Sequence, residues 1–128
     1  MLLHCLHHIA IICSDYERSK KFYTEILGFT IVREVYRAER QSYKLDLALN
    51  GHYLIELFSF PDPPARLSRP EAVGLRHLAF QVADIESAKK ELEEKGVKSE
   101  PIRIDEFTGK KFTFFSDPDG LPIELYEA

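Results

Sequence analysis

The hydrophobic pattern of the chain predicts two short helices, each with an apolar face. Apolar side chains recur at three- and four-residue intervals in two stretches, and each stretch begins near a cap-type residue and ends near a glycine. The residues concerned are Asp15, Phe22, Ile26, Gly28 and Phe29 in the first stretch, and Asp84, Ile85, Ala88, Leu92 and Gly96 in the second. Each helix therefore has a face to bury against another element.

Runs rich in β-branched and aromatic residues predict three strands after each helix. A further apolar segment, which starts at His8 in one half and at His77 in the other, precedes each helix. Asn50-Gly51 is a two-residue hairpin signal, and a turn at 116–120 holds the matching place in the second half. The expected strands cover 29–36, 43–49 and 53–58, and then 97–104, 112–115 and 121–126. Each half therefore has the order β-α-β-β-β.

The two halves are copies of one unit. Seven residues separate the His from the capping Asp in both halves, and the glycine follows thirteen residues later in one and twelve in the other. A proline-rich connector at about 61–73 separates a first module, about 1–60, from a second, about 74–128. A repeated unit must bury its sheet face against something else. We expect one α+β domain over 1–128, in which two tandem βαβββ modules pair their sheets around a cup-shaped metal-binding cavity, either within one chain or across a swapped dimer.

One His and one Glu occupy matching places in the two modules. Glu56 follows His8 after 48 residues, and Glu124 follows His77 after 47. Each Glu stands inside an apolar strand, where an ionised carboxylate is costly unless it is paired or binds a metal. Two imidazole nitrogens and two carboxylate oxygens leave positions open for water or substrate, and they suit Zn, Ni, Co, Mn or Fe. A lone strand His or Glu is usually a packing or surface residue, but four in register predict a site for one divalent metal ion.

Strand alternation predicts which side chains share a face with these ligands. His8 should share its face with Ala10, and His77 with Ala79, so that small side chains leave room beside both histidines. The histidines expected to face away from the site or to be structural are His7, which should point away from His8, and His4 and His52.

Composition excludes several classes of partner. The net charge is −4 with the signs interspersed, which favours neither nucleic acid nor an anionic membrane surface. No apolar run approaches the roughly 20 residues of a membrane span. Cys5 and Cys13 would lie roughly 26 Å apart in an extended segment, too far for a disulfide. The N-terminal residues show no secretory leader, and we expect a cytoplasmic protein.

Basic residues near the expected site have two readings. They either belong to a solvated strand and loop or hold an anionic substrate, and the sequence leaves both open. The residues concerned are Arg33, Arg37, Arg40, Lys44, Lys110 and Lys111, of which Arg37, Lys44 and Lys111 are the expected substrate contacts.

Three motifs carry a resemblance that covers nearly the whole chain. They are His8-Ile9-Ala10-Ile11, then Ser19-Lys20-Lys21-Phe22-Tyr23 leading to Leu27-Gly28-Phe29, and finally Asp117-Pro118-Asp119-Gly120 leading to Ile123-Glu124-Leu125. With these motifs the chain resembles the vicinal oxygen chelate superfamily (glyoxalase, bleomycin resistance and dioxygenase proteins). Within it, the chain is similar to the small bacterial glyoxalase I-like proteins of the YaeR type.

The resemblance implies a metal in a cup between paired βαβββ modules, where vicinal substrate oxygens bind the ion and an enolate is stabilised. It implies that His8, Glu56, His77 and Glu124 are the ligands, as in bacterial glyoxalase I. The epimerases of the family commonly have Gln at the position of Glu56. Bacterial glyoxalase I also has an Arg four residues after its first His ligand, which helps hold the glutathione carboxylate. This chain has Ile12 there, so we expect a smaller or less anionic substrate.

Three functions fit these residues. The first is a metal-dependent, glyoxalase I-like lyase or isomerase in which Glu124, with Glu56 as its partner, moves a proton at a carbon next to a carbonyl. The second is a non-catalytic protein that binds a small molecule, and the third is an Fe(II) dioxygenase. The presence of both carboxylates favours the first. We expect a small-molecule substrate and a homodimer, without nucleic acid or membrane partners.

Overall fold

The computed structural model describes residues 1–128, and its contacts divide the chain into two units, Met1–Ala65 and Arg66–Ala128. The division falls inside the predicted proline-rich connector. Each unit contains one four-stranded sheet and one helical segment in the order β-α-β-β-β. The predicted α+β class and the βαβββ order of each module are therefore confirmed. No helix is long and apolar enough to cross a membrane.

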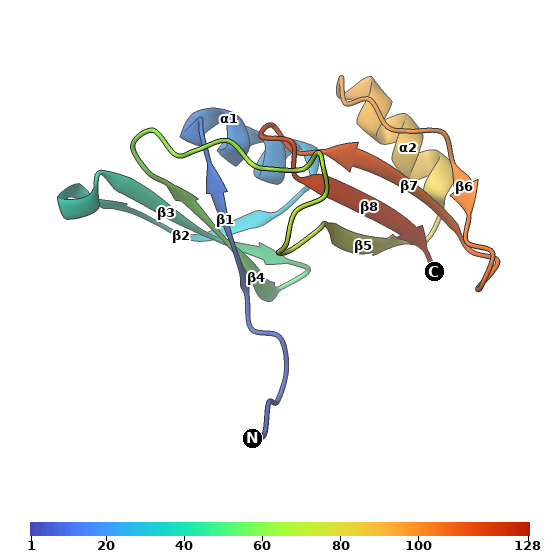
Figure 1. Cartoon of the computed structure of the whole chain (residues 1–128), viewed down its shortest axis with the longest axis horizontal. Coiled ribbons are helices and arrows are strands. Elements are labelled where there is room, and N and C mark those ends of the chain that lie inside the picture. Colours follow the sequence, from blue (N-terminus) through green and yellow to red (C-terminus); the bar gives the residue numbers. More distant parts are fainter. The chain divides into compact units, whose positions relative to one another are not determined.

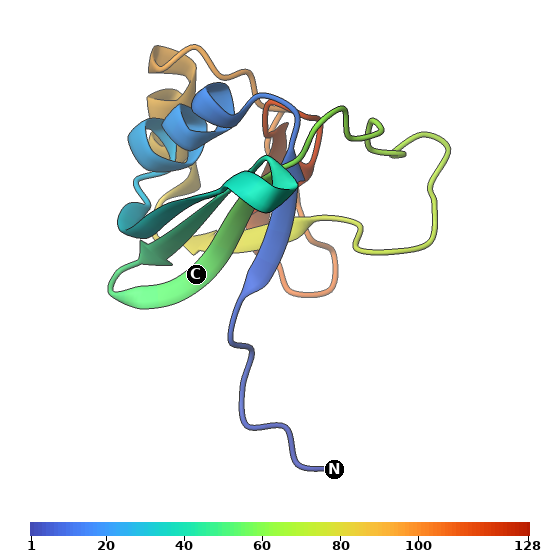
Figure 2. The ribbon, with the colours of Figure 1, turned by 90° about the vertical axis from the view of Figure 1, so that its left-hand side faces the viewer.

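The first unit forms a mixed sheet with one helix against it. Its elements are β1 (Ile9–Cys13), α1 (Tyr16–Lys21), a π-helical turn (Phe22–Ile26), β2 (Thr30–Arg37), a 3₁₀ turn (Ala38–Arg40), β3 (Ser42–Leu49) and β4 (His52–Ser59). The strand order is β1-β4-β3-β2, with β1 parallel to β4 and the other pairs antiparallel. α1 lies on one face of this sheet, and the chain before β1 extends beyond the end of that strand (Figures 1 and 2).

The second unit repeats this arrangement. Its elements are β5 (Leu78–Val82), α2 (Ile85–Glu94), β6 (Arg103–Ile104), β7 (Lys111–Ser116) and β8 (Pro122–Glu127). The strand order is β5-β8-β7-β6, and β5 is parallel to β8 as β1 is to β4. α2 packs on β7 and β8 (Figure 1). Within each sheet, equivalent strands thus occupy equivalent positions.

Alternation along the strands separates a buried apolar face from a polar one in each sheet. The fully buried residues of the helix-covered faces include Leu45, Leu47, Ile55 and Leu57 in the first unit and Thr113 and Ile123 in the second. Lys44, Asp46 and Glu56 alternate with these residues along β3 and β4 and project to the opposite face. The side chains that carry chemistry therefore stand on the face that each helix leaves uncovered.

The helix boundaries follow the capping residues that the sequence indicated. The carboxylates of Asp15 and Asp84 each accept a hydrogen bond from the backbone N–H three residues further on, at 3.2 and 3.1 Å. Gly28 and Gly96 follow the helical segments with φ of 81° and 82°, a left-handed conformation that glycine adopts without strain. The predicted helix starts and glycine stops are confirmed.

The predicted strand at 97–104 was wrong for most of its length, because only Arg103–Ile104 forms a ladder, with β7. Pro101 has no N–H to donate to a neighbouring strand. The carbonyl oxygen of Glu100 instead accepts hydrogen bonds from the side chains of Lys89 and Thr113, at 2.9 and 2.7 Å. Side chains thus satisfy this carbonyl oxygen, while the Glu100 N–H donates to the Phe114 carbonyl of β7 at 2.9 Å.

Candidate metal-binding site

The first unit brings His8 and Glu56 together on the uncovered face of its sheet. Ala10 of β1 is paired in register with Glu56 of β4, and His8 lies just before β1 begins. The His8 Nε2 and Glu56 Oε2 atoms are 3.5 Å apart. The parallel pairing of β1 with β4 therefore joins two residues that are 48 positions apart in the sequence.

The second unit places His77 and Glu124 in the same relation. Ala79 of β5 is paired with Glu124 of β8, as Ala10 is with Glu56. The His77 Nε2 and Glu124 Oε2 atoms are 3.1 Å apart. The His77 ring meets Phe114 edge to face, with the ring centroids 5.1 Å apart. Both Glu side chains are mostly buried, with 13% and 14% of their surfaces exposed.

The donor atoms of each pair suit a divalent ion. Two atoms that bind one ion at about 2.0–2.2 Å lie about 3 Å apart when they occupy neighbouring coordination positions. The N–O separations of 3.5 and 3.1 Å are close to this value. Neither unit alone gathers three or more His, Cys, Asp or Glu side chains in a cluster that could hold a metal. Each unit thus contains one His–Glu pair.

A polar network that the sequence did not reveal surrounds Glu56. The Tyr53 hydroxyl donates to Glu56 Oε2 at 2.5 Å, and Lys44 Nζ is 3.7 Å from the same oxygen. Lys44 also donates to Asp46 at 2.7 Å, and the Arg33 guanidinium donates to Asp46 at 3.0 Å. The network connects β2, β3 and β4, so its members are neighbours only once the strands are paired.

The network sets the protonation of two of its members. Burial, and then hydrogen bonds to Glu56 and Asp46, raise the pKa of Tyr53, so its phenol remains a donor. Burial alone would raise the pKa of Asp46, which is 1% exposed, but hydrogen bonds from Lys44, Tyr53 and Arg33 outweigh burial and lower it. Asp46 is therefore a buried carboxylate balanced by two cations.

The expectation that His7 faces away from His8 was wrong. Their Nδ1 atoms are 2.9 Å apart, and the His7 ring lies 5.4 Å from that of Tyr53. Strand alternation does not apply to His7 and His8, because β1 begins only at Ile9. His7 is therefore a neighbour of the first pair.

The three expected substrate contacts occupy different surroundings. Lys44 lies beside Glu56, as described above. Arg37 stacks on Phe58, which shares the uncovered face with Glu56. Lys111 instead forms an ion pair with Glu86 of α2, at 2.7 Å, and so belongs to the helix-covered side of its sheet. The structure does not bring Lys111 beside Glu124.

Comparison with known proteins assigns the family. Residues 5–125 match the model of the Glyoxalase/Bleomycin resistance protein/Dioxygenase superfamily. The chain belongs to this superfamily. It is 68% identical to the uncharacterized protein YwkD of Bacillus subtilis, over 99% of both chains, and 66% identical to the uncharacterized protein YaeR of Escherichia coli, over 95% of both. The crystal structure of a glyoxalase family protein from Enterococcus faecalis has 53% identity and a TM-score of 0.92, and the match covers 99% of this chain and 100% of that one.

More distant members of the superfamily have enzyme names. Glyoxylase I 4 of Arabidopsis thaliana is 31% identical over 94% of this chain and 68% of its own. The 2-epi-5-epi-valiolone epimerase of an Actinomyces species is 29% identical over 94% of this chain and 77% of its own. The superfamily thus includes lyases and isomerases, and its members commonly bind a divalent metal.

Proposed function

We propose that this protein is a metal-dependent isomerase or lyase that acts at a carbon next to a carbonyl in a small substrate with vicinal oxygens. His8, Glu56, His77 and Glu124 hold one divalent ion. The observation that carries the proposal is the equivalent register of the two His–Glu pairs, because Ala10 faces Glu56 as Ala79 faces Glu124. Two equivalent pairs with matched donor separations are what a shared four-ligand site requires.

The ion would supply Lewis acidity toward the vicinal substrate oxygens and favour loss of the proton on the adjacent carbon. The carboxylates of Glu56 and Glu124 are the groups that can take this proton and return it. With two carboxylates at the site, one can remove a proton from the substrate and the other can deliver a proton to a second position on it. The names of the distant relatives, a glyoxylase and an epimerase, belong to this class of chemistry.

The surroundings of the two carboxylates support Glu124 as the group that transfers the proton. Glu56 Oε2 already accepts from Tyr53 and lies close to Lys44, so its position is restrained. Glu124 has His77 as its polar neighbour and an aromatic wall formed by Phe114, which pairs with it across the sheet. Glu124 is therefore freer to swing between the ion and the substrate carbon, while Glu56 acts chiefly as a ligand.

Metal content and proton exchange test the proposal together. Elemental analysis of purified protein should find one divalent ion per chain. NMR in D₂O should then show metal-dependent exchange of the proton next to the carbonyl in a panel of 2-oxo aldehydes, offered with and without thiols. Tight binding of these compounds without exchange would make the protein a small-molecule binder. Oxygen uptake in place of exchange would make it an oxygenase, and either result would overturn the proposal.

A further inference from the structure

Arg37 is the one arginine of the chain that is not exposed. It ends β2, and its Cζ atom lies 5.0 Å from the centre of the Phe58 ring and 5.9 Å from that of Phe60. Stacking on two rings restrains the planar guanidinium and leaves N–H groups at its edge to donate hydrogen bonds.

The hydrogen-bonding capacity of Arg37 is largely unused. A guanidinium carries five N–H donors. Nη2 donates to Ser42 Oγ at 3.0 Å, whereas Nε is buried without any acceptor, and no carboxylate lies within ion-pair distance. Arg103 of the second unit is stacked in the same way, on Phe112 and Phe114, but it is paired with Glu100 at 3.0 Å. Arg37 is thus a fixed cation that lacks an anion.

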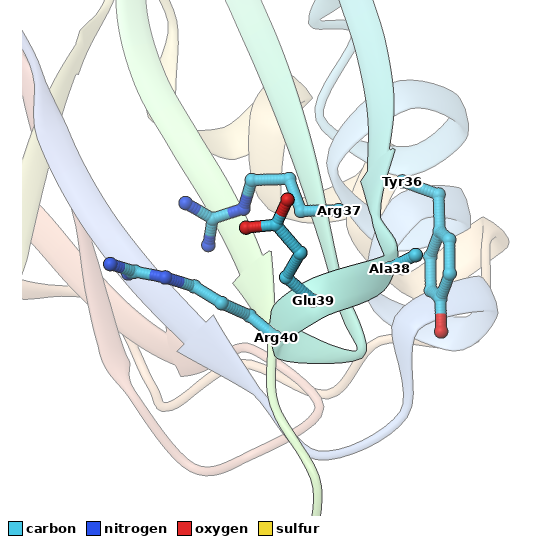
Figure 3. A pocket seen from close by; sticks show the side chains of 5 residues that line it. All are labelled: Tyr36, Arg37, Ala38, Glu39 and Arg40. Carbon is cyan, nitrogen blue, oxygen red and sulfur yellow. The ribbon is translucent and has the colours of Figure 1, made fainter.

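A cavity of about 340 Å³ adjoins this group, at the tip of the β2–β3 hairpin. It is lined by Tyr36, Arg37, Ala38, Glu39 and Arg40. Figure 3 shows the Arg37 and Arg40 side chains on the same side of the hairpin as Glu39, with Tyr36 directed the other way. Glu39 forms no ion pair with either arginine, so the two guanidiniums leave this side of the cavity with a net positive charge.

The cavity continues the face that carries the first His–Glu pair. Phe58 stands two residues beyond Glu56 on β4, about 7 Å along the same face. Lys44 is paired with Phe58 across the sheet and reaches back toward Glu56. One face therefore presents, in order, a metal-ligating carboxylate, a lysine, an aromatic platform and an unpaired arginine.

We infer that Arg37, assisted by Arg40, binds an oxyanion, a carboxylate or a phosphate, at the end of the substrate remote from the metal. A guanidinium edge matches either anion through two parallel hydrogen bonds. The identification of this anion as part of the substrate rests on the proposed function, while the anion site itself does not. The two-residue step from Glu56 to Phe58 along β4 places the anionic group at least about 7 Å from the metal-bound oxygens.

A metal-free titration tests the anion site by itself. The Nε–Hε resonances of ¹⁵N-labelled protein are followed during addition of glutarate or of inorganic phosphate. The resonance that disappears in Arg37→Gln should shift saturably with at least one anion, and comparison of the two anions tells which is preferred. Arg103→Gln is the matched control, stacked on two rings but already ion-paired, and it should leave the titration unchanged. The inference would be overturned if the Arg37 resonance shifted without saturating. It would also be overturned if Arg103→Gln weakened anion binding as much as Arg37→Gln does.

A pair of metal-chelating probes tests the link to the metal. Adipic acid monohydroxamate offers vicinal oxygens to the ion and a carboxylate at the far end, and its terminal amide lacks only that charge. Calorimetry on the metal-loaded protein should give about 10–100-fold tighter binding of the acid, a preference that Arg37→Gln removes and Arg103→Gln keeps. Equal binding of acid and amide would overturn the inference and leave the proposed function standing. Failure of both probes, with a saturable metal-free titration, would refute the proposed function and leave an anion site at Arg37.

Discussion

Glu56 and Glu124 occupy the same register but have different neighbours. Glu56 is held by a phenol and an amine, whereas Glu124 faces an imidazole and an aromatic ring. The repeat makes the two residues equivalent as ligands, and the side chains around them make them unequal as proton carriers. This difference can be measured.

Replacing Glu124 by Gln should separate metal binding from proton transfer. The amide keeps the size and one oxygen donor of the side chain but cannot accept the proton. We expect the variant to retain much of its metal and to lose roughly 10²–10⁴-fold in turnover of any substrate found by proton exchange. Glu56→Gln is the matched comparison and should lose less turnover. Equal losses would show that the carboxylates share the proton transfer, and normal turnover in Glu124→Gln would leave it a ligand only.

Tyr53→Phe should weaken metal binding without unfolding the protein. The Tyr53 hydroxyl donates a hydrogen bond to the Glu56 carboxylate and so orients it. Removal of such a supporting hydrogen bond to a metal ligand typically lowers metal affinity about 10–100-fold. Competition with a chromogenic chelator measures this affinity. Tyr43→Phe, which removes a hydroxyl from a stacked ring outside the network, is the control and should bind metal like the parent. An unchanged affinity in Tyr53→Phe would mean that Glu56 needs no such support.

At the residue scale, the prediction of the two His–Glu pairs came from the internal repeat. A His and a Glu at matching places in two copies could be recognised without a structure, because strand pairing conserves register between copies. Tyr53 and Asp46 escaped notice because neither has a counterpart in the second half, and their contacts with Glu56, Lys44 and Arg33 cross strand boundaries. Only the paired strands bring these side chains together.

At the scale of elements, a polar contact connects the first helix to the edge of its sheet. Glu34 of β2 accepts hydrogen bonds from Lys20 at 2.7 Å and from Tyr16 at 2.5 Å, both on α1. These two hydrogen bonds lower the pKa of Glu34, and the bond from Lys20 has the larger effect. The contact complements the apolar face by which α1 packs on the sheet.

Glu34→Gln should therefore destabilise the protein in a pH-dependent way. A carboxyl whose pKa is lower in the folded state stabilises that state above the unfolded pKa, about 4.3, and the contribution vanishes as pH falls through the folded value. Because Glu34 is partly exposed and screened by solvent, we expect a loss of about 1 kcal/mol at pH 7. Urea unfolding should show that the difference in unfolding free energy between the parent and the variant narrows at pH 3. Glu94→Gln, at an exposed position of α2, should unfold like the parent at both pH values. A pH-independent loss in Glu34→Gln would contradict the assignment.

The sequence predicted the elements best where pattern and caps agreed. The strands of the first unit and the second helix lie within a residue or two of the expected bounds. Residues 97–102 were expected to continue a strand, but Pro101 has no N–H to donate. The side chains of Lys89 and Thr113 instead donate to backbone carbonyls of this segment. The π-helical turn that continues α1 was also unforeseen, because apolar spacing does not distinguish it from an α-helix.

At the scale of the whole molecule, each unit presents sheet edges that its own strands do not pair. β2 is an edge strand, and it exposes Ile31, Val32 and Val35. Exposed apolar edge strands favour association with another chain. We expect a homodimer, which sedimentation equilibrium at micromolar concentration can establish. Val32→Lys on this edge should weaken the dimer if β2 contributes to it, and a monomeric parent protein would refute the prediction outright.

The last prediction concerns how many ions the two His–Glu pairs hold. If both pairs serve one ion, removal of either must abolish tight binding, because two donors alone hold a divalent ion weakly. We expect His8→Ala/Glu56→Ala and His77→Ala/Glu124→Ala each to lose essentially all of the one ion per chain, as measured by elemental analysis after dialysis. His52→Ala/Glu17→Ala, which removes an exposed His and Glu outside the pairs, should keep it.

The two pair variants also decide which chains share a site. When they are unfolded together and refolded as mixed dimers, a site built within one chain stays incomplete in every dimer. A site built across two chains is complete once in each mixed dimer, which restores about half an ion per chain in those dimers. Either result agrees with one shared site. Retention of about half the metal in each unmixed variant would instead mean two independent pairs, and the four-ligand site would have to be abandoned.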